Sequence, residues 1–232
     1  MIKRLFSFVL VVGLGFVFYH ALTNITASGK LSGVSAEYAE REASELGAAN
    51  LVTAIVVTYR GLDTLGEVSV LFLAATGIAV LLRRKKNAVQ VQPSEKRGSS
   101  EILKTGTDLL VPIIVMFGVY IFMNGHLTPG GGFQGGAVIA SAVMLQFLAN
   151  PAYKLNHTVF GFIESMSGFF YVTIGILGIF LAGGFLDNRI LPLGSFGNIL
   201  SAGAIPLIYT LIGLKVGTEL AGILDNMRRD AQ

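Results

Sequence analysis

Charged and titratable side chains inside otherwise apolar segments are the groups of this chain that could do chemistry. The densest set is Arg60, Asp63 and Glu67 in YRGLDTLGEV. Their spacings of three and four residues place them on one face of a helix. Asp63 could cap the N-terminus of that helix, with Arg60 as its counter-charge. Glu67 lies about one turn deeper, where a carboxylate needs a protein or water neighbour, so it could bind a proton or a cation on an ion path.

The segment HLTPGGGFQGG, from His126 to Gly136, is the second polar feature. Its five glycines and one proline cannot all be helical, so we predict a compact hairpin between two apolar segments. His126 is either a plain histidine at the rim or a proton-handling group near the outer surface. The residues expected to form the hairpin are Pro129, Gly130, Gly131, Gly132, Phe133, Gly135 and Gly136.

Three further charged residues lie in apolar surroundings near the C-terminus. Glu164 sits among Phe160, Phe162 and Ile163, and it could either bridge helices or belong to an ion path. Lys215 and Glu219 are four residues apart and could pair with each other. Lys215 could also extend its long side chain to the inner membrane interface.

The composition indicates a chain surrounded by lipid. Hydrophobic residues make up 53% of its 232 residues and charged residues only 13%, which is about half the charged share of a soluble domain. The chain has no cysteine and three histidines. These counts exclude disulfides and cysteine-ligated metal sites and disfavour haem or copper, so we expect no metal and no cofactor. The net charge of +3 gives no indication of nucleic-acid binding.

Six segments are long and apolar enough to cross a bilayer, which predicts an all-α, polytopic membrane protein. The first follows Lys3 and Arg4 and could be a secretory signal, although an uncleaved span suits the topology better. Before the second span, we predict an acidic helix over 35–46, with Ser35 as its N-cap, and an interfacial or re-entrant helix over 48–59. The six predicted spans are 5–22, 64–82, 108–123, 134–148, 159–181 and 198–216.

The basic residues predict the orientation and the organisation of the chain. With both termini in the cytoplasm, thirteen of the 17 Lys and Arg residues fall on the inner side, as the positive-inside rule requires for a protein of the cell membrane. A polar linker, 87–100, separates a two-span unit, 1–86, from a four-span unit, 101–232. Gly, Ala and Ser are frequent in the spans and allow close helix packing.

The hairpin motif and the preceding DLLVPIIVMFGVYIFMNG closely resemble the B subunit of Mrp-type Na⁺/H⁺ antiporters. The corresponding subunit of archaeal-type membrane-bound hydrogenases and sulfane-sulfur reductases is similar, and GLKVGTEL is nearer to these respiratory versions. Residues 1–86, with NLVTAIVVTYRGLDTLGEVSVLFLAATG, resemble the small neighbouring subunit and the C-terminal tail of the large A subunit. The resemblance therefore implies two neighbouring subunits fused in one chain.

The resemblance implies an accessory, non-catalytic subunit of a multi-subunit Na⁺/H⁺ antiporter. Its partners would be large antiporter-like subunits and small membrane subunits. The resemblance places the notable positions on His126, Pro129 and Phe133 and the membrane carboxylates on Asp63 and Glu67. Together with Glu164, which its apolar surroundings indicate, Asp63, Glu67 and His126 form the predicted ion pathway. One alternative is the same module inside a redox-driven complex, with hydrogenase or sulfur-reductase subunits as partners. A second alternative is a purely structural spacer, whose polar residues only bridge subunits.

Overall fold

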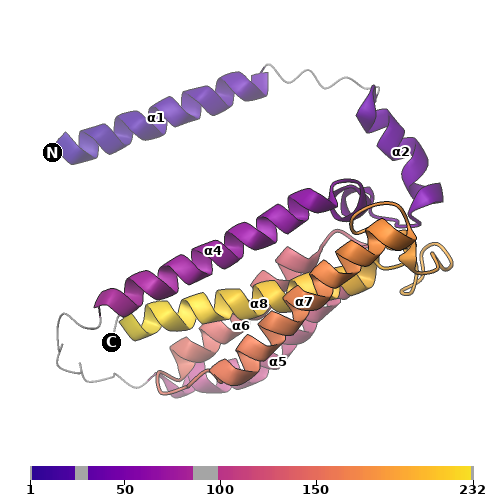
Figure 1. Cartoon of the computed structure of the whole chain (residues 1–232). Helices are drawn as coiled ribbons and strands as arrows, with labels where there is room; N and C mark the ends of the chain where they lie inside the picture. Colours follow the sequence, from indigo (N-terminus) through magenta and orange to yellow (C-terminus); the bar gives the residue numbers. More distant parts are fainter. Residues whose placement is uncertain (1, 24–30, 86–98, 231–232) are drawn as a thin grey trace. The chain divides into compact units, whose positions relative to one another are not determined.

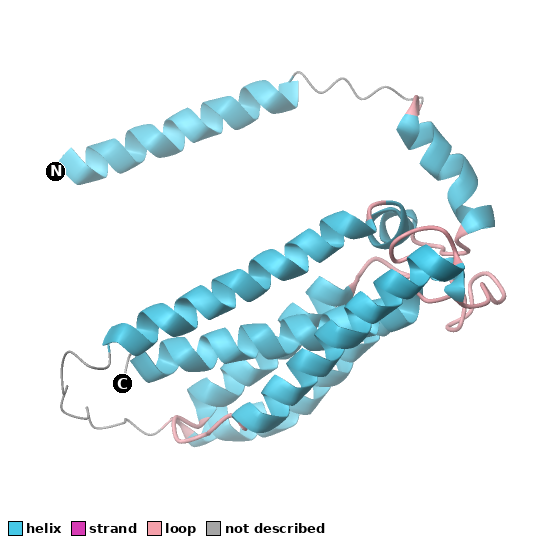
Figure 2. Ribbon diagram, viewed as in Figure 1, coloured by secondary structure: helices cyan, strands magenta, loops and turns pink. Residues whose placement is uncertain are grey.

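The computed structural model describes residues 2–23, 31–85 and 99–230, and these residues form helices and loops without a strand (Figures 1 and 2). They belong to two compact units, Met1–Glu37 and Tyr38–Gln232. The first unit contains α1 (Ile2–Thr23), which is apolar around most of its circumference. Most of the predicted linker 87–100 lies outside the described residues, so the proposed boundary between two fused subunits stays a prediction.

The second unit is a helical bundle built around its C-terminal helix. Helix α8 packs against each of the other four long helices. Its buried stripe contains Ile205, Ile208, Tyr209, Ile212 and Val216, and these spacings of one, three and four residues are those of one helix face. The five long helices are α4 (Gly61–Lys85), α5 (Glu101–Met123), α6 (Gly132–Ala149), α7 (His157–Leu181) and α8 (Ile205–Asp230).

The outward faces of these helices are apolar. Leu73 on α4, Leu109 and Met116 on α5 and Phe162 on α7 are each about two-thirds exposed. Large apolar side chains at this density suit lipid or other subunits rather than water. Together with α1, the bundle provides six helices long and apolar enough to cross a membrane. The predicted all-α, six-span, multi-pass membrane protein is confirmed.

The predicted position of the sixth span is wrong. The segment 198–204 is a loop, with Ala202 and Gly203 in the left-handed region, and α8 begins at Ile205 and continues to Asp230. The predicted end at Val216 therefore lies in the middle of this helix. Lys215 therefore lies about 15 Å along α8 and not at the inner end, since each residue adds about 1.5 Å.

The two helical segments expected before the second span are present, but their boundaries and capping residues differ from the prediction. Helix α2 covers Val34–Glu45, so Ser35 is inside it and is not its N-cap; the Ser35 hydroxyl donates to the carbonyl oxygen of Ser32. The apolar run 48–59 contains α3 (Leu51–Ala54) and the π-helix η1 (Ile55–Tyr59). Asn50 caps α3 by accepting a hydrogen bond from the backbone N–H of Thr53.

The glycine-rich segment is only partly a hairpin, because α6 already begins at Gly132. Three of its glycines lie in the first turns of this helix, where they allow close contact with neighbouring helices. A Cβ at Gly132 would lie 2.6 Å from the Cβ of Ile212 on α8, and one at Gly135 would lie 2.5 Å from the carbonyl oxygen of Gly118 on α5. These glycines are therefore needed for helix packing rather than for turn geometry.

Replacing Gly136 by valine is expected to destabilise the bundle by about 3 kcal/mol, the upper part of the range for overpacked cores. A Cβ there would lie 2.8 Å from the carbonyl oxygen of Gly213 and from the Cβ of Val216. The thermal unfolding midpoint of the purified protein in detergent measures the effect. Gly106→Val on α5 is the matched control, since nothing lies within 4 Å of a Cβ at Gly106. Equal midpoints for the two variants would contradict the packing role.

Candidate functional site

Asp63 and Glu67 lie in the first two turns of α4, and Arg60 directly precedes this helix. Arg60 and Asp63 form an ion pair with both side chains more than half exposed. Glu67 is exposed on the surface of this bundle, within a helix that can span the membrane. A carboxylate in that position requires another subunit or water beside it.

A cap of three loop segments covers the bundle end at which α4 and α8 begin. The side chain of Asn50 donates hydrogen bonds to the carbonyl oxygens of Gly125 (2.8 Å) and Thr128 (3.0 Å). The hydroxyl of Thr53 also donates to Gly125 (2.6 Å), and Tyr209 of α8 donates to the Thr53 hydroxyl (3.2 Å). We call the segments 45–60, 124–131 and 182–204 the loop cap. Sequence reasoning missed Asn50, Thr53 and Tyr209 because their partners are far away in the chain.

His126 is fully buried within the loop cap. Its Nε2 lies 3.3 Å from the carbonyl oxygen of Asn198, and its Nδ1 has no hydrogen-bond partner among the described residues. Burial lowers the pKa of His126 below its usual value, and hydrogen bonds to backbone carbonyls oppose this only partly. His126 therefore lies at the end of the bundle but is buried there, and its ring lies where protonation is unfavourable.

His126→Gln is expected to reduce the loss of stability in acid. Below a pH of about 6.5 the unfolded chain binds a proton that the folded chain does not take up, so His126 makes stability fall as the pH falls. Unfolding midpoints at about pH 7.5 and about pH 5.5 measure this difference. Asn198→Gln, which exchanges no titratable group and keeps the backbone carbonyl beside the ring, should retain the wild-type pH dependence. An unchanged acid effect in His126→Gln would show that the ring does not stay neutral.

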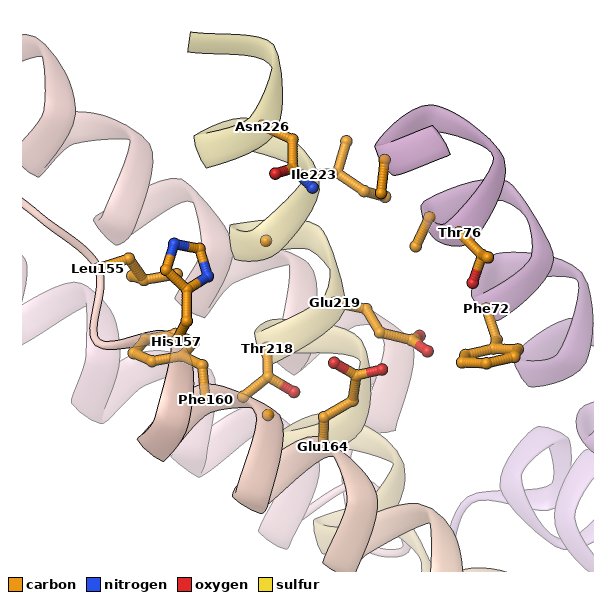
Figure 3. A pocket seen from close by; sticks show the side chains of 14 residues that line it. Phe72, Thr76, Leu155, His157, Phe160, Glu164, Thr218, Glu219, Ile223 and Asn226 are labelled. Atoms are coloured by element: carbon orange, nitrogen blue, oxygen red, sulfur yellow. The ribbon is translucent and has the colours of Figure 1, made fainter. Parts of the chain in front are cut away.

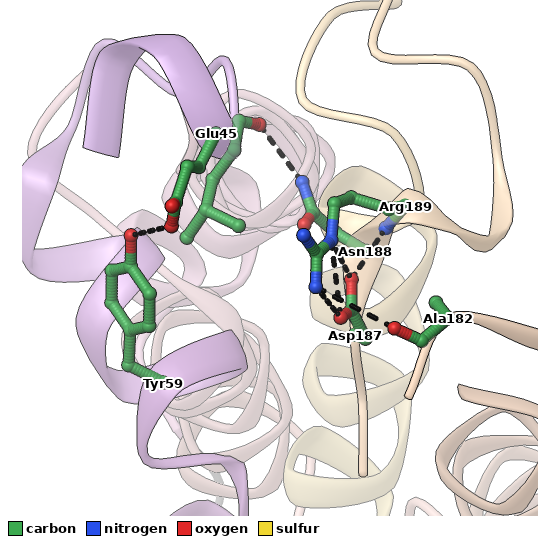
Figure 4. A network of polar contacts seen from close by, with 7 residues as sticks. Glu45, Tyr59, Ala182, Asp187, Asn188 and Arg189 are labelled. Carbon is green, nitrogen blue, oxygen red and sulfur yellow. Dashed lines mark hydrogen bonds and ion pairs between the residues drawn. The ribbon is translucent and has the colours of Figure 1, made fainter. Parts of the chain in front are cut away.

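The loop between α7 and α8 adds two charged residues that the sequence did not single out (Figure 4). Arg189 donates to both carboxylate oxygens of Asp187, at 2.5 to 3.1 Å. Burial alone would raise the pKa of Asp187, but the hydrogen bonds and charge of Arg189 outweigh it and keep this pKa below its usual value. Asp187 and Arg189 line a pocket of about 490 Å³ together with Arg60 and Asp63. The pocket thus has two ion pairs on its wall.

Asn188 joins this loop to the rest of the loop cap. Its side-chain amide is fully buried and donates to the carbonyl oxygens of Leu46 (2.8 Å) and Ala202 (2.9 Å). Its backbone carbonyl accepts from the N–H of Ala204 at the start of α8. Nearby, the hydroxyl of Tyr59 donates to Glu45 at 2.9 Å (Figure 4).

Glu164, Lys215 and Glu219 gather in the middle of the bundle, although they are up to 55 residues apart in the chain. The Lys215 Nζ lies 2.5 Å from Glu219 Oε1, and the pair is almost fully buried. Glu164 and Glu219 both line a pocket of about 230 Å³ between α4, α7 and α8 (Figure 3). Glu164 is therefore beside the Lys215–Glu219 pair, which the sequence did not predict, and away from Asp63 and His126.

The described residues contain no group of three or more His, Asp or Glu side chains arranged to hold a metal ion. The candidate site contains ion pairs, buried carboxylates and two pockets. Carboxylates and ion pairs of this kind are able to bind protons or monovalent cations.

Two family models match the chain. A model described as a domain related to the MnhB subunit of Na⁺/H⁺ antiporters matches residues 102–222. A second, described as the E subunit of MBH, matches residues 2–97. Protein MJ1307 of Methanocaldococcus jannaschii, whose function is uncharacterised, is 31% identical over 198 residues, which is 75% of this chain and 74% of the relative.

Two solved structures are similar to the chain. A chain of the membrane-bound sulfane sulfur reductase, an archaeal respiratory membrane complex, is 44% identical with a TM-score of 0.81, and 98% of each chain is covered. A chain of the Mrp complex from Dietzia sp. DQ12-45-1b has a TM-score of 0.75 at 22% identity. That alignment covers 97% of this chain but only 26% of the Dietzia chain, so it shows a shared fold within a larger polypeptide.

Proposed function

The chain belongs to the family with the domain related to the MnhB subunit of Na⁺/H⁺ antiporters, and we propose that it is an accessory membrane subunit of an Mrp-type cation/proton-translocating module. The match over 102–222 carries this proposal. In this role the chain scaffolds ion paths and has no catalytic centre of its own. Large antiporter-like subunits and small membrane subunits are its partners.

The module operates inside a redox-driven respiratory complex. The observation that favours this setting is the 44% identity over 98% of both chains with the sulfane sulfur reductase chain, against 22% with the Mrp chain. The absence of cysteine from this chain places any iron–sulfur cluster in partner subunits. Electron transfer in those subunits would drive ion movement through the membrane part.

Exposed polar groups on membrane helices support a role beside other subunits. Glu67 is exposed on α4 among apolar side chains such as Val70 and Leu73. A carboxylate in contact with lipid is costly, so a partner subunit or a hydrated path covers it in the assembled complex. We assign Asp63 and Glu67 to the ion path at this surface and Glu164 to the path inside the bundle.

The composition of the native complex tests the setting. The tagged chain is purified from its native membrane in mild detergent, and the co-purifying proteins are identified by mass spectrometry. Antiporter-like subunits together with iron–sulfur or nickel–iron proteins are expected. Antiporter-like subunits alone would indicate a free antiporter, and neither class would contradict the proposed function.

Transport by the same complex tests the assigned carboxylates. Glu67→Gln is expected to lower Na⁺-dependent proton movement in proteoliposomes while the subunit composition stays unchanged. Glu37→Gln on α2 is the control, since this residue lies outside every membrane-spanning helix. Full transport after amide replacement of both Asp63 and Glu67 would favour a structural spacer.

A further inference from the structure

Two glutamates, Glu164 and Glu219, line the pocket between α4, α7 and α8, and most of the other lining residues are apolar (Figure 3). Helix α4 contributes Phe72 and Thr76 with two alanines, so its side of the pocket has no titratable group. Helix α7 contributes Glu164, two turns from its first residue, and α8 contributes Glu219. Figure 3 shows the two carboxylates pointing toward one another across the pocket.

Glu219 is the residue whose surroundings indicate that a ligand binds in this pocket. Only 1% of its side chain is exposed. Its Oε1 accepts a hydrogen bond from Lys215, but its buried Oε2 has no partner among the described residues. A buried carboxylate oxygen without a donor is costly and is stabilised when it gains one. A proton on either carboxylate would provide such a donor to the other carboxylate.

The charges of the cluster also favour the uptake of one proton. Lys215 carries one positive charge, while Glu164 and Glu219 carry two negative charges when both are ionised. The Lys215 Nζ also lies 5.2 Å from the ring centroid of Phe72, and Gly168 of α7 leaves room for its aliphatic stem. The remaining charge of −1 at membrane depth is unfavourable. One proton makes the cluster neutral.

A polar route leads from this cluster to the bundle end at which α7 begins and α8 ends. His157, the first residue of α7, and Asn226 line the same pocket. Just beyond them, the fully buried Asp225 lies 3.0 Å from His157 Nε2 and 2.8 Å from Arg229 Nε. Thr218 and Asn226, the first and last lining residues on α8, are eight residues apart, which is about 12 Å along the helix. The pocket thus connects the polar helix end with the middle of the span.

We propose that the pocket between α4, α7 and α8 is a proton-binding site, in which Glu164 and Glu219 share one exchangeable proton that enters from the His157 end. The proposal rests on the proposed function, because it places the site in the membrane part of an ion-translocating complex. Proton transfer needs no further reactant: a hydronium ion at the His157 end gives up the proton and becomes water, and a carboxylate oxygen accepts the proton.

The geometry favours a proton over a sodium ion. The ammonium of Lys215 already occupies one oxygen of Glu219, and a second cation beside it would be repelled. Two carboxylates, one of them paired, are a poor replacement for the hydration shell of a metal cation, whereas they suffice to share a proton.

Labelling of the purified native complex with dicyclohexylcarbodiimide tests the proposal, since this hydrophobic reagent reacts with protonated carboxyl groups. Peptide mass spectrometry then locates the label. We expect label on Glu164 or Glu219, at most one per chain, and about tenfold less for each pH unit above the titration midpoint. Glu164→Gln should lower the labelling of Glu219 by about tenfold or more, because the Lys215–Glu219 pair is then neutral without a proton. Glu101, at the exposed start of α5 beside Lys104, should stay unlabelled throughout.

Several results would overturn the proposal. They are no label on either glutamate at any pH, label on both in one chain, or full labelling of Glu219 in Glu164→Gln. Protection by Na⁺ at constant pH would assign a cation site instead. If the complex with Glu164→Gln does not assemble, the dependence of labelling on pH and on Na⁺ in the wild-type complex still tests the proposal. A complex that transports ions but is not labelled would contradict the proton-binding site and leave the proposed function standing. A complex that is labelled but moves no ions would contradict the proposed function and leave the site standing.

Discussion

Lys215→Met is expected to destabilise the bundle by about 3–5 kcal/mol at neutral pH, because it leaves the carboxylate of Glu219 buried without its counter-charge. Lys215 is 11% exposed and Glu219 1% exposed in their side chains, so water cannot replace the lost partner. Little folded protein should be recovered in detergent at neutral pH. Recovery and the unfolding midpoint should both improve in acid, since protonation removes the unpaired charge.

The double variant Lys215→Met/Glu219→Gln distinguishes two costs. One is the cost of removing the whole ion pair, and the other is the cost of leaving Glu219 buried without its counter-charge. Replacing a buried ion pair by uncharged residues of similar volume is often nearly neutral, so this variant should recover most of the stability. Lys104→Met is the matched control, because Lys104 pairs with Glu101 at an exposed position and should change the midpoint little. A double variant as unstable as Lys215→Met would show that packing of the lysine stem, rather than charge, holds this part of α8.

The spans were predictable from the sequence where hydropathy and helix boundaries coincide. Helix α5 ends at Met123 and α7 at Leu181, where an apolar run meets a polar or glycine-rich turn. The prediction of the sixth span was wrong because the apolar run and the helix boundaries do not coincide there. The loop 198–204 is apolar enough to resemble a membrane segment, while the second half of α8 carries Glu219 and Asp225, which are tolerated only because the bundle buries and pairs them.

The two parts of the candidate site differ in how far the sequence could predict them. The ion pair of Arg60 and Asp63 follows from a spacing of three on one helix. The neighbourhood of Glu164 and Glu219 depends on α7 packing against α8, and the contacts of the loop cap join residues up to 156 positions apart. Local periodicity contains no information about such pairs. This is why Asn50, Asn188 and Tyr209 showed no signal in the sequence.

Asn188→Ala is expected to open the loop cap, because it removes the donor to two buried carbonyl oxygens, those of Leu46 and Ala202. The Leu46 carbonyl oxygen then loses its donor, which costs about 1–3 kcal/mol, whereas the Ala202 carbonyl oxygen keeps the N–H of Ile205 at 3.2 Å. Space for a rearrangement that could replace these bonds is limited, since even a Cβ at Gly203 would clash with the Asn188 carbonyl oxygen. We expect a lower unfolding midpoint and faster proteolysis within 182–204.

The control for this prediction is Asn198→Ala, a replacement of the same kind at an exposed position of the same loop. It keeps the backbone carbonyl that faces His126, so it should leave both the midpoint and the proteolysis pattern close to wild type. Equal behaviour of the two variants would mean that the loop is held by its apolar contacts, such as those of the fully buried Leu186. A selective effect of Asn188→Ala would instead show that one amide joins the segment before α3 to the start of α8, and so couples the two parts of the chain that the family models match separately.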